Sequence, residues 1–242
     1  MTAETSDEHP APLPPTTWQF PHASQSDEHG VVGVGGDLEP ATVIHAYKSG
    51  LFPMPIDDAD NIAWWSPPER GVLDFSDLKI SKSLRRSCRR YETTVNAAFD
   101  DVIDMCSELP RDGGWISPKI VTAYKRLHRL GWAHSVETWQ GDDLVGGLYG
   151  VQIRGLFAGE SMFHLATDAS KVALVSLVAS LRSVGVELLD VQWSTDHLAT
   201  LGVRRITRRE YLHRLNSALL SQASPLSRLS GQNIGHEMLE TP

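Results

Sequence analysis

The feature that most constrains the fold is a series of short apolar segments after Gly131. Runs rich in Val, Leu and aromatic residues predict strands at residues 133–139, 144–151, 153–159 and 186–191, with a Gly-Asp-Asp turn at 141–143 between the first two. Residues 168–184 are apolar on nearly every side, which is typical of a helix packed on a sheet, and Gly185 ends that helix. The pattern predicts a β-β-β-α-β sheet domain.

Helical periodicity dominates the rest of the chain. Apolar spacing and end signals predict helices at 39–50, 81–91, 96–108 and 117–131, and a capping-box pattern at Thr207 begins a final helix. The expected fold class is α+β, with a helical N-terminal domain and a C-terminal mixed sheet with flanking helices. We expect a disordered tail at 1–17, an N-terminal domain with a basic helix at 18–92, a catalytic domain at 93–220 and a flexible tail at 221–242.

Composition excludes several classes of protein. The chain has 242 residues, 41% of them hydrophobic, and a formal net charge of −8. Its two cysteines are too few for a disulfide framework, so we expect a reducing compartment. The first thirty residues lack the apolar core of a secretory signal, and residues 172–181, the longest apolar stretch, are too few to span a bilayer. We therefore expect no membrane role.

A cluster of positive charge stands out against this acidic background. Six basic and no acidic side chains fall within residues 79–90. On a helix, Lys82, Arg85, Arg86 and Arg89 lie on one face that can follow a line of phosphates, and Arg90 adds to it. Many basic helix faces are simply solvated, so nucleic acid is one of two interpretations.

Polar residues at the predicted sheet form a second candidate site. Glu160 follows the strand at 153–159, and Asp190 and Gln192 are two apart on the next strand, which places both side chains on one face. Such groups are costly to bury unless they are hydrogen-bonded or used in chemistry, so catalysis and a structural network both remain open. Neither cysteine has a ligand-spaced partner and the histidines are scattered, so we expect no metal.

Ten motifs, in order from about residue 20 to 215, make the chain similar to the leucyl/phenylalanyl-tRNA–protein transferase family. They include Val34-Gly-Gly-Asp-Leu38, Gly50-Leu-Phe-Pro53, Trp64-Trp-Ser-Pro67, Trp115-Ile116, Gly159-Glu-Ser-Met-Phe163 and Asp190-Val-Gln192. The resemblance implies a C-terminal domain with the fold of GCN5-related acetyltransferases. It also implies a cytoplasmic enzyme without cofactors that moves Leu, and also Phe or Met, from aminoacyl-tRNA to an N-terminal Arg or Lys of a protein. That transfer marks the acceptor for N-end-rule degradation.

The resemblance also implies roles for individual residues. Asp190 would polarise Gln192, whose side-chain oxygen orients the attacking amine, and Glu160 would favour cationic acceptors. The aminoacyl pocket would comprise Leu148, Phe157, Leu174 and Leu177. Tyr47, Trp115 and Tyr124 would pack around the terminal adenosine, and Lys82, Arg85, Arg86, Arg89 and Arg90 would bind the tRNA backbone. Met54 stands where the family commonly has tryptophan.

Two other functions compete with this one. An acetyl-CoA-dependent N-acetyltransferase would share the sheet, but residues 160–167 contain no glycine for a pyrophosphate loop. A non-catalytic tRNA-binding module would need the basic helix and leave Glu160, Asp190 and Gln192 unexplained. A monomer is expected, since no surplus apolar helix is evident.

Overall fold

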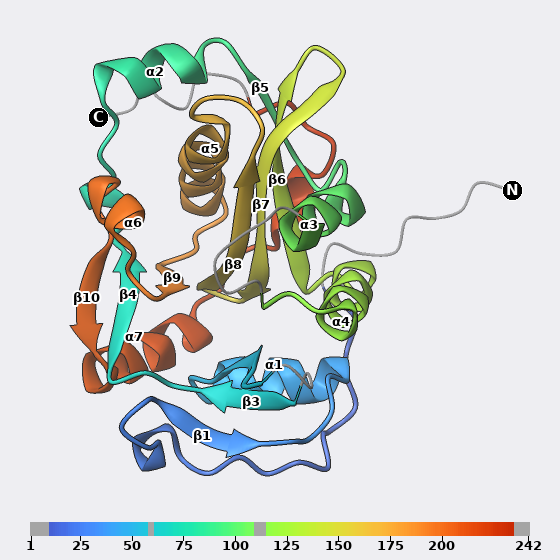
Figure 1. Ribbon diagram of the computed structural model, residues 1–242, viewed down its shortest axis with the longest axis vertical. Coiled ribbons are helices and arrows are strands. Elements are labelled where there is room, and N and C mark those ends of the chain that lie inside the picture. The colour runs from blue at the N-terminus through green and yellow to red at the C-terminus, as the bar shows by residue number, and fades with distance from the viewer. Residues whose placement is uncertain (1–9, 58–60, 109–114, 235–242) are drawn as a thin grey trace, which may run out of the picture.

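The computed structural model describes residues 10–57, 61–108 and 115–234. A seven-stranded sheet, ordered β10-β4-β9-β8-β7-β6-β5, forms its centre (Figure 1). The strands are β4 (Glu69–Leu73), β5 (Glu92–Val95), β6 (Ala133–Gln140), β7 (Asp143–Ile153), β8 (Leu156–His164), β9 (Leu188–Gln192) and β10 (Arg204–Thr207). Neighbours are antiparallel except β8 and β9, which run parallel.

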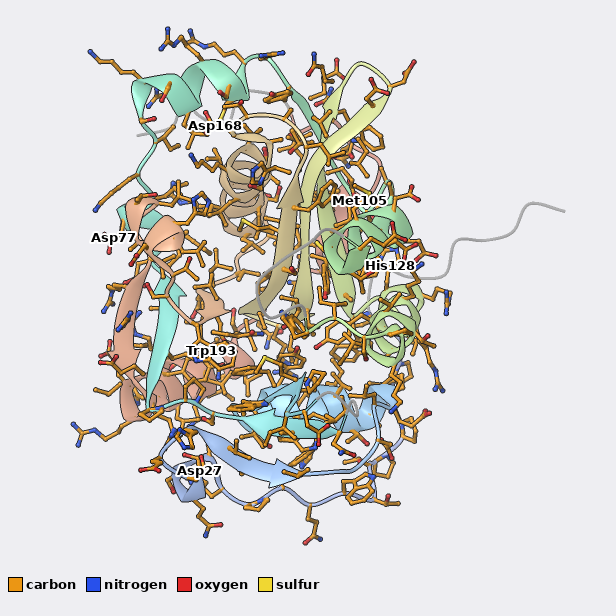
Figure 2. The ribbon with its side chains drawn as sticks, viewed as in Figure 1. Asp27, Asp77, Met105, His128, Asp168 and Trp193 are labelled. Atoms are coloured by element: carbon orange, nitrogen blue, oxygen red, sulfur yellow. The ribbon has the colours of Figure 1, made fainter. Side chains whose placement is uncertain are left out.

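Helices cover both faces of this sheet. On one face α5 (Ala169–Ser183) packs on β6, β7 and β8, and α2 (Lys82–Cys88) packs on α5. The other face carries α3 (Phe99–Glu108) and α4 (Pro118–Arg129), where the ring of His128 stacks on Phe99 with centroids 4.1 Å apart (Figure 2). The helix α7 (Arg208–Leu220) packs against β4, β8, β9 and β10, and the short α6 (Asp196–Thr200) follows β9.

The predicted α+β class and the β-β-β-α-β order are confirmed by β6, β7, β8, α5 and β9. One strand differs from the prediction. The segment expected at 153–159 is β8, which begins at Leu156 and continues to His164, because Ile153 completes β7 and Arg154 turns the chain with φ 52°. Glu160 therefore lies inside β8 and not after it.

The N-terminal region contains less helix than expected. Its single longer helix, α1 (Pro40–Lys48), packs against β2 and α4, and an antiparallel sheet ordered β1-β3-β2 completes the region. The strands β1 (Val31–Val34), β2 (Phe52–Pro55) and β3 (Ile62–Trp65) have four residues each. Prolines and glycines interrupt the period-two alternation that would have predicted them.

The two ends of the chain and the domain boundary differ from the expectations. Residues 10–17, expected to be disordered, include Ala11, whose amide donates to Leu130 and whose carbonyl accepts from Trp132. Residues 221–234, expected to be flexible, include the fully buried Leu226. Residues 1–9 and 235–242 lie outside the described residues. The strand β4 joins the large sheet and α2 packs on it through α5, so the boundary at 92 cuts through one packed unit.

Candidate active site

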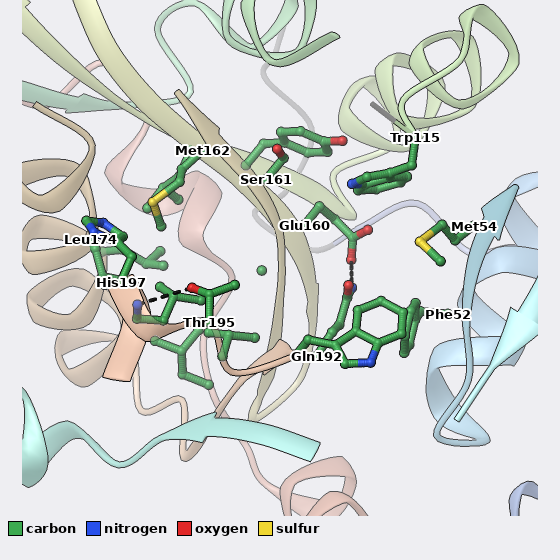
Figure 3. A pocket seen from close by; sticks show the side chains of 18 of the residues that line it. Phe52, Met54, Trp115, Glu160, Ser161, Met162, Leu174, Gln192, Thr195 and His197 are labelled. Atoms are coloured by element: carbon green, nitrogen blue, oxygen red, sulfur yellow. Dashed lines mark hydrogen bonds between the residues drawn. The ribbon is translucent and has the colours of Figure 1, made fainter. Parts of the chain in front are cut away.

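A pocket of about 320 Å³ opens where β8 and β9 separate. Their parallel pairing ends at Ala158 and Asp190. Beyond that point Glu160 on β8 and Gln192 on β9 face each other, and Gln192 Nε2 donates to Glu160 Oε1 at 2.7 Å (Figure 3). A carboxylate and an amide thus meet inside a mainly apolar pocket.

The side chains of Glu160 and Gln192 both point into this opening because the backbone is irregular at each of them. Glu160 is the extra residue of a bulge, because Gly159 pairs with Gly150 and Ser161 pairs with Tyr149. Gln192 has φ 62°, a left-handed conformation that is uncommon for a residue other than glycine. Regular alternation along the strand, which underlies the prediction for Asp190 and Gln192, does not hold at this point.

Two tyrosine hydroxyls hold the Glu160 carboxyl group from α1 and α4. Tyr47 donates to Oε1 at 2.6 Å and Tyr124 to Oε2 at 3.1 Å, and the two hydroxyls are 2.5 Å apart. Burial and the nearby Glu160 raise the pKa of both tyrosines well above 10, so both hydroxyls stay protonated. The expectation that Tyr47 and Tyr124 pack around adenosine needs correction, because their side chains are buried and unavailable for stacking.

Burial is the reason why the pKa of Glu160 lies near neutrality. Burial raises its pKa to about 7, although the hydrogen bonds from Tyr47 and Tyr124 lower it. Glu160 can therefore exchange a proton at physiological pH.

Asp190 is held in a different environment from Gln192. Its side chain is fully buried, its two oxygens share the N–H of Arg70 Nε at 2.9 and 3.1 Å, and Oδ2 also accepts from Nη2 at 2.7 Å. It also accepts from the Tyr211 hydroxyl at 2.8 Å and from the backbone amide of Gln192 at 2.8 Å. Asp190 does not line the pocket. Its contact with Gln192 is through the Gln192 backbone, so Asp190 positions Gln192. The expected polarisation of the Gln192 side chain by Asp190 is replaced by a contact with Glu160.

One end of the pocket is aliphatic. Three of the residues predicted for the aminoacyl pocket, Leu148, Leu174 and Leu177, line it together with Met162, Leu189, Val191 and Leu198. Phe157, the fourth predicted pocket residue, does not line it and is buried in the cluster behind these leucines. Phe157 therefore supports the wall of the pocket from behind.

The other end is aromatic. Trp115, which was predicted to pack against the terminal adenosine, lines this end and lies opposite Met54, with Phe52 nearby (Figure 3). Trp193 adds a further ring, edge-on to Phe52 with centroids 4.8 Å apart. A flat, largely apolar group such as a nucleobase fits between such side chains.

Known proteins match most of this chain. The family described as "Leucyl/phenylalanyl-tRNA protein transferase" matches residues 72–216, and the family described as its N-terminal domain matches residues 36–68. A relative from Anaeromyxobacter sp. (strain K), named leucyl/phenylalanyl-tRNA–protein transferase, is 50% identical over 83% of this chain and 88% of its own length. The like-named protein of Shewanella denitrificans is 43% identical over 88% and 91%.

The chain belongs to the leucyl/phenylalanyl-tRNA–protein transferase family. Two solved structures resemble it remotely. A GCN5-related N-acetyltransferase from Kribbella flavida has a TM-score of 0.36 and 12% identity over 65% of this chain and 57% of that one. L-PGS from Bacillus licheniformis has a TM-score of 0.37 and 14% identity over 54% and 49%.

The basic side chains of α2 lie on the surface of the protein. Lys82, Arg85, Arg86, Arg89 and Arg90 are all exposed on α2 or directly after it, while Leu84 and Cys88 face the protein. Asp168, at the start of α5, lies directly below α2 (Figure 2). The basic side chains thus stay available to a polyanion on the α5 side of the molecule.

Several residues of the site escaped the sequence analysis. Arg70 and Tyr211 bind Asp190, and Trp193 and His197 line the pocket. A single arginine before a glycine gives no signal of its own, since its partner lies 120 residues away. Among the described residues, no group of three or more His, Cys, Asp or Glu side chains could hold a metal ion, and no helix is long and apolar enough to span a membrane.

Proposed function

We propose that this transferase moves Leu, and also Phe, from aminoacyl-tRNA to the α-amine of proteins that begin with Arg or Lys. The observation that carries the proposal is the pairing of Glu160 with Gln192 between an aliphatic and an aromatic pocket end. The aliphatic end suits the side chain of Leu or Phe, whose burial is worth about 1.5–3 kcal/mol. The aromatic end suits the terminal adenosine, with Trp115 and Met54 as its walls. We also propose that the protein is a cytoplasmic monomer and that the transfer marks its acceptors for N-end-rule degradation.

Glu160 is the proton acceptor in this mechanism. The attacking α-amine has a pKa of about 7.7–8.0 and must lose a proton as it attacks the ester carbonyl. Among the described residues that line the pocket, Glu160 alone is acidic, and its pKa of about 7 is close to that of the amine. Close matching favours proton transfer at neutral pH. The ribose oxygen leaves and takes up a proton, so the ester becomes an amide without an energy source.

Gln192 positions the amine. Its Nε2 is bound to Glu160, which leaves the amide oxygen to accept a hydrogen bond from the incoming nitrogen. Asp190 accepts a hydrogen bond from the backbone amide of Gln192 and thereby holds Gln192 in its left-handed conformation. Placing the amine beside the ester is worth up to about 7–11 kcal/mol in ideal cases. The negative charge of Glu160 also favours the cationic acceptor terminus over a neutral one.

A transfer assay tests the function. Labelled leucyl-tRNA is incubated with two peptides that differ only in the first residue, Arg or Ala. We expect label on the Arg peptide only. Label on neither peptide, with charged tRNA retained on a filter, would support a binding module, whereas acetylation from acetyl-CoA would support the acetyltransferase.

Replacing Tyr47 by Phe is expected to shift the pH profile. The variant loses a hydrogen bond to the Glu160 carboxylate, worth about 1.5 kcal/mol, so the acid-limb pKa of kcat/KM rises by about 1 unit. Tyr211→Phe removes an equally buried hydroxyl from Asp190 and should leave that pKa in place. An unshifted profile in Tyr47→Phe would argue against Glu160 as the titrating group.

Leu174→Phe is expected to make the enzyme more selective for Leu. Leu174 lines the aliphatic end, and a ring there shortens the space available for a phenylalanyl side chain. The ratio of kcat/KM for leucyl-tRNA to that for phenylalanyl-tRNA should rise about tenfold, in line with the cost of overfilling an apolar pocket. Competition between the two charged tRNAs in one reaction measures the ratio, and an unchanged ratio would place the aminoacyl side chain elsewhere.

A further inference from the structure

Between α2 and the pocket lies a short surface that the proposed mechanism does not use. The C-terminal end of α2 is attached to the segment before α5, because Ser87 Oγ donates to Asp168 Oδ2 at 3.1 Å and the Tyr91 hydroxyl donates to the Thr167 carbonyl at 3.1 Å. This segment begins where β8 ends. It therefore connects the basic helix with the strand that carries Glu160.

Three basic or potentially basic side chains lie along this connection. His164 is the exposed last residue of β8, and Lys171 lies in the first turn of α5. His197 on α6 is exposed and lines the pocket near Leu174 (Figure 3). We call His164, Lys171 and His197 the bridge surface, since they fill the interval between α2 and the pocket.

The members of the bridge surface are close enough to interact. Burial lowers the pKa of His197, and the positive charge of Lys171 and of His164 lowers it further. Charges influence one another in this way within about 10 Å. Asp168 is the acidic group in the cluster, and it forms an ion pair with Lys171 at 2.9 Å. An ammonium group carries three N–H donors, so this pair orients Lys171 and leaves two donors for another acceptor.

We propose that the bridge surface binds backbone phosphates of the unpaired 3′ end of the tRNA. The inference rests on the proposed function, since it concerns how that same substrate reaches Glu160. A tRNA whose paired stem lies on the exposed basic side chains of α2 must cross this interval to place its last nucleotide beside Trp115. An approaching phosphate can accept N–H donors from both His197 and Lys171. Contacts of this kind position the strand without reading its sequence.

Two substrates separate this role from that of the pocket. Full-length leucyl-tRNA carries the 3′ phosphates, whereas 3′-O-leucyl-adenosine has the same ester and adenosine without them. We expect Lys171→Ala to lower the ratio of kcat/KM for leucyl-tRNA to that for leucyl-adenosine about tenfold, through KM. The slope of log KM for leucyl-tRNA against log salt should become shallower by about 0.7 for each phosphate that the variant no longer neutralises.

Further variants control for indirect effects. His164→Gln does not disturb the ion pair with Asp168 and is expected to lower the same ratio severalfold, and Lys171→Arg should largely restore it. Lys48→Ala removes a lysine that lies over Trp132, outside the pocket, and should leave the ratio as it is. Arg89→Ala on α2 should lower the ratio as a positive control.

The outcomes are distinct. Equal losses with both substrates would show that Lys171 acts by shaping the pocket, and no loss with either would show that the phosphates take another path. Both results overturn the proposal. A wild-type protein that transfers leucine from neither substrate would instead refute the proposed function.

Discussion

Glu160→Gln is expected to lower kcat for leucyl transfer to an Arg-starting peptide by about 10²- to 10⁴-fold, the range typical of a lost general base. Glutamine has nearly the same shape, and its amide oxygen can accept from Tyr47 while its amide nitrogen donates to the Tyr124 hydroxyl, so the pocket should keep its form. It cannot take up a proton at neutral pH. The KM for leucyl-tRNA should change little, because Glu160 acts on the amine and not on the ester. Single-turnover transfer of labelled leucine measures the effect.

The stability of the same variant provides an independent check. The folded-state pKa of Glu160, about 7, exceeds the ordinary value of 4.5, so proton binding favours the folded protein. This stabilisation is fully present below pH 4.5 and is lost as the pH rises through 7. Glutamine remains neutral throughout. Glu160→Gln should therefore melt at a higher temperature than the wild type at pH 8, and the two should converge near pH 5.

A matched control is Glu92→Gln on the exposed surface of β5, which should alter neither activity nor this pH dependence. If Glu160→Gln kept more than a tenth of wild-type kcat, proton acceptance by Glu160 would be wrong. Positioning by Gln192 or solvent would then have to supply the rate.

Asp190→Ala is expected to destabilise the protein by about 3–5 kcal/mol, because it leaves the charge of Arg70 buried without its partner. Both side chains are at most 1% exposed. The guanidinium also lies between the rings of Phe52 and Tyr211, 4.5 and 4.4 Å from their centroids, so it has no route to water. At about 2–4 °C per kcal/mol, the melting temperature should fall by roughly 10 °C. Thermal unfolding of the purified full chain measures it.

The double variant Asp190→Leu with Arg70→Met tests the reason for that loss. An apolar pair of similar volume removes both charges, so the double variant should be clearly more stable than Asp190→Ala alone. Its activity should stay low, since nothing then holds the amide of Gln192. If Asp190→Ala melted like the wild type while kcat fell a thousandfold, Asp190 would act in chemistry and the structural role would be wrong.

Much of the fold could be predicted from apolar periodicity alone. The helices α1 to α5 and α7 and the strands β6 to β9 were all expected near their observed positions. The strands β1 to β5 and β10, of four or five residues each, were missed because so few residues show no clear period, whereas the equally short β9 was expected from the Val- and Leu-rich run at 186–191. Their existence depends on partners elsewhere in the chain, such as Trp65 opposite Val31 and Phe52.

The site shows the same division. Glu160, Gln192 and three of the four pocket residues could be identified from strand position and family motifs. The roles of Tyr47 and Tyr124 could not, because the choice between stacking and donating a hydrogen bond depends on burial. The bulge at Glu160 and the left-handed conformation of Gln192 bring these two side chains into contact, and no local sequence pattern predicts either feature.

The origin of the two tyrosines has a consequence for incomplete forms of the protein. Tyr47 belongs to the segment matched by the N-terminal family, whereas Tyr124 and Glu160 belong to the segment matched by the other. A truncated product lacking the first segment would keep the carboxylate yet lose one of its two hydroxyl donors and the helix that delivers it. We expect such a fragment to lose transfer activity, because the proton acceptor would no longer be held from both segments.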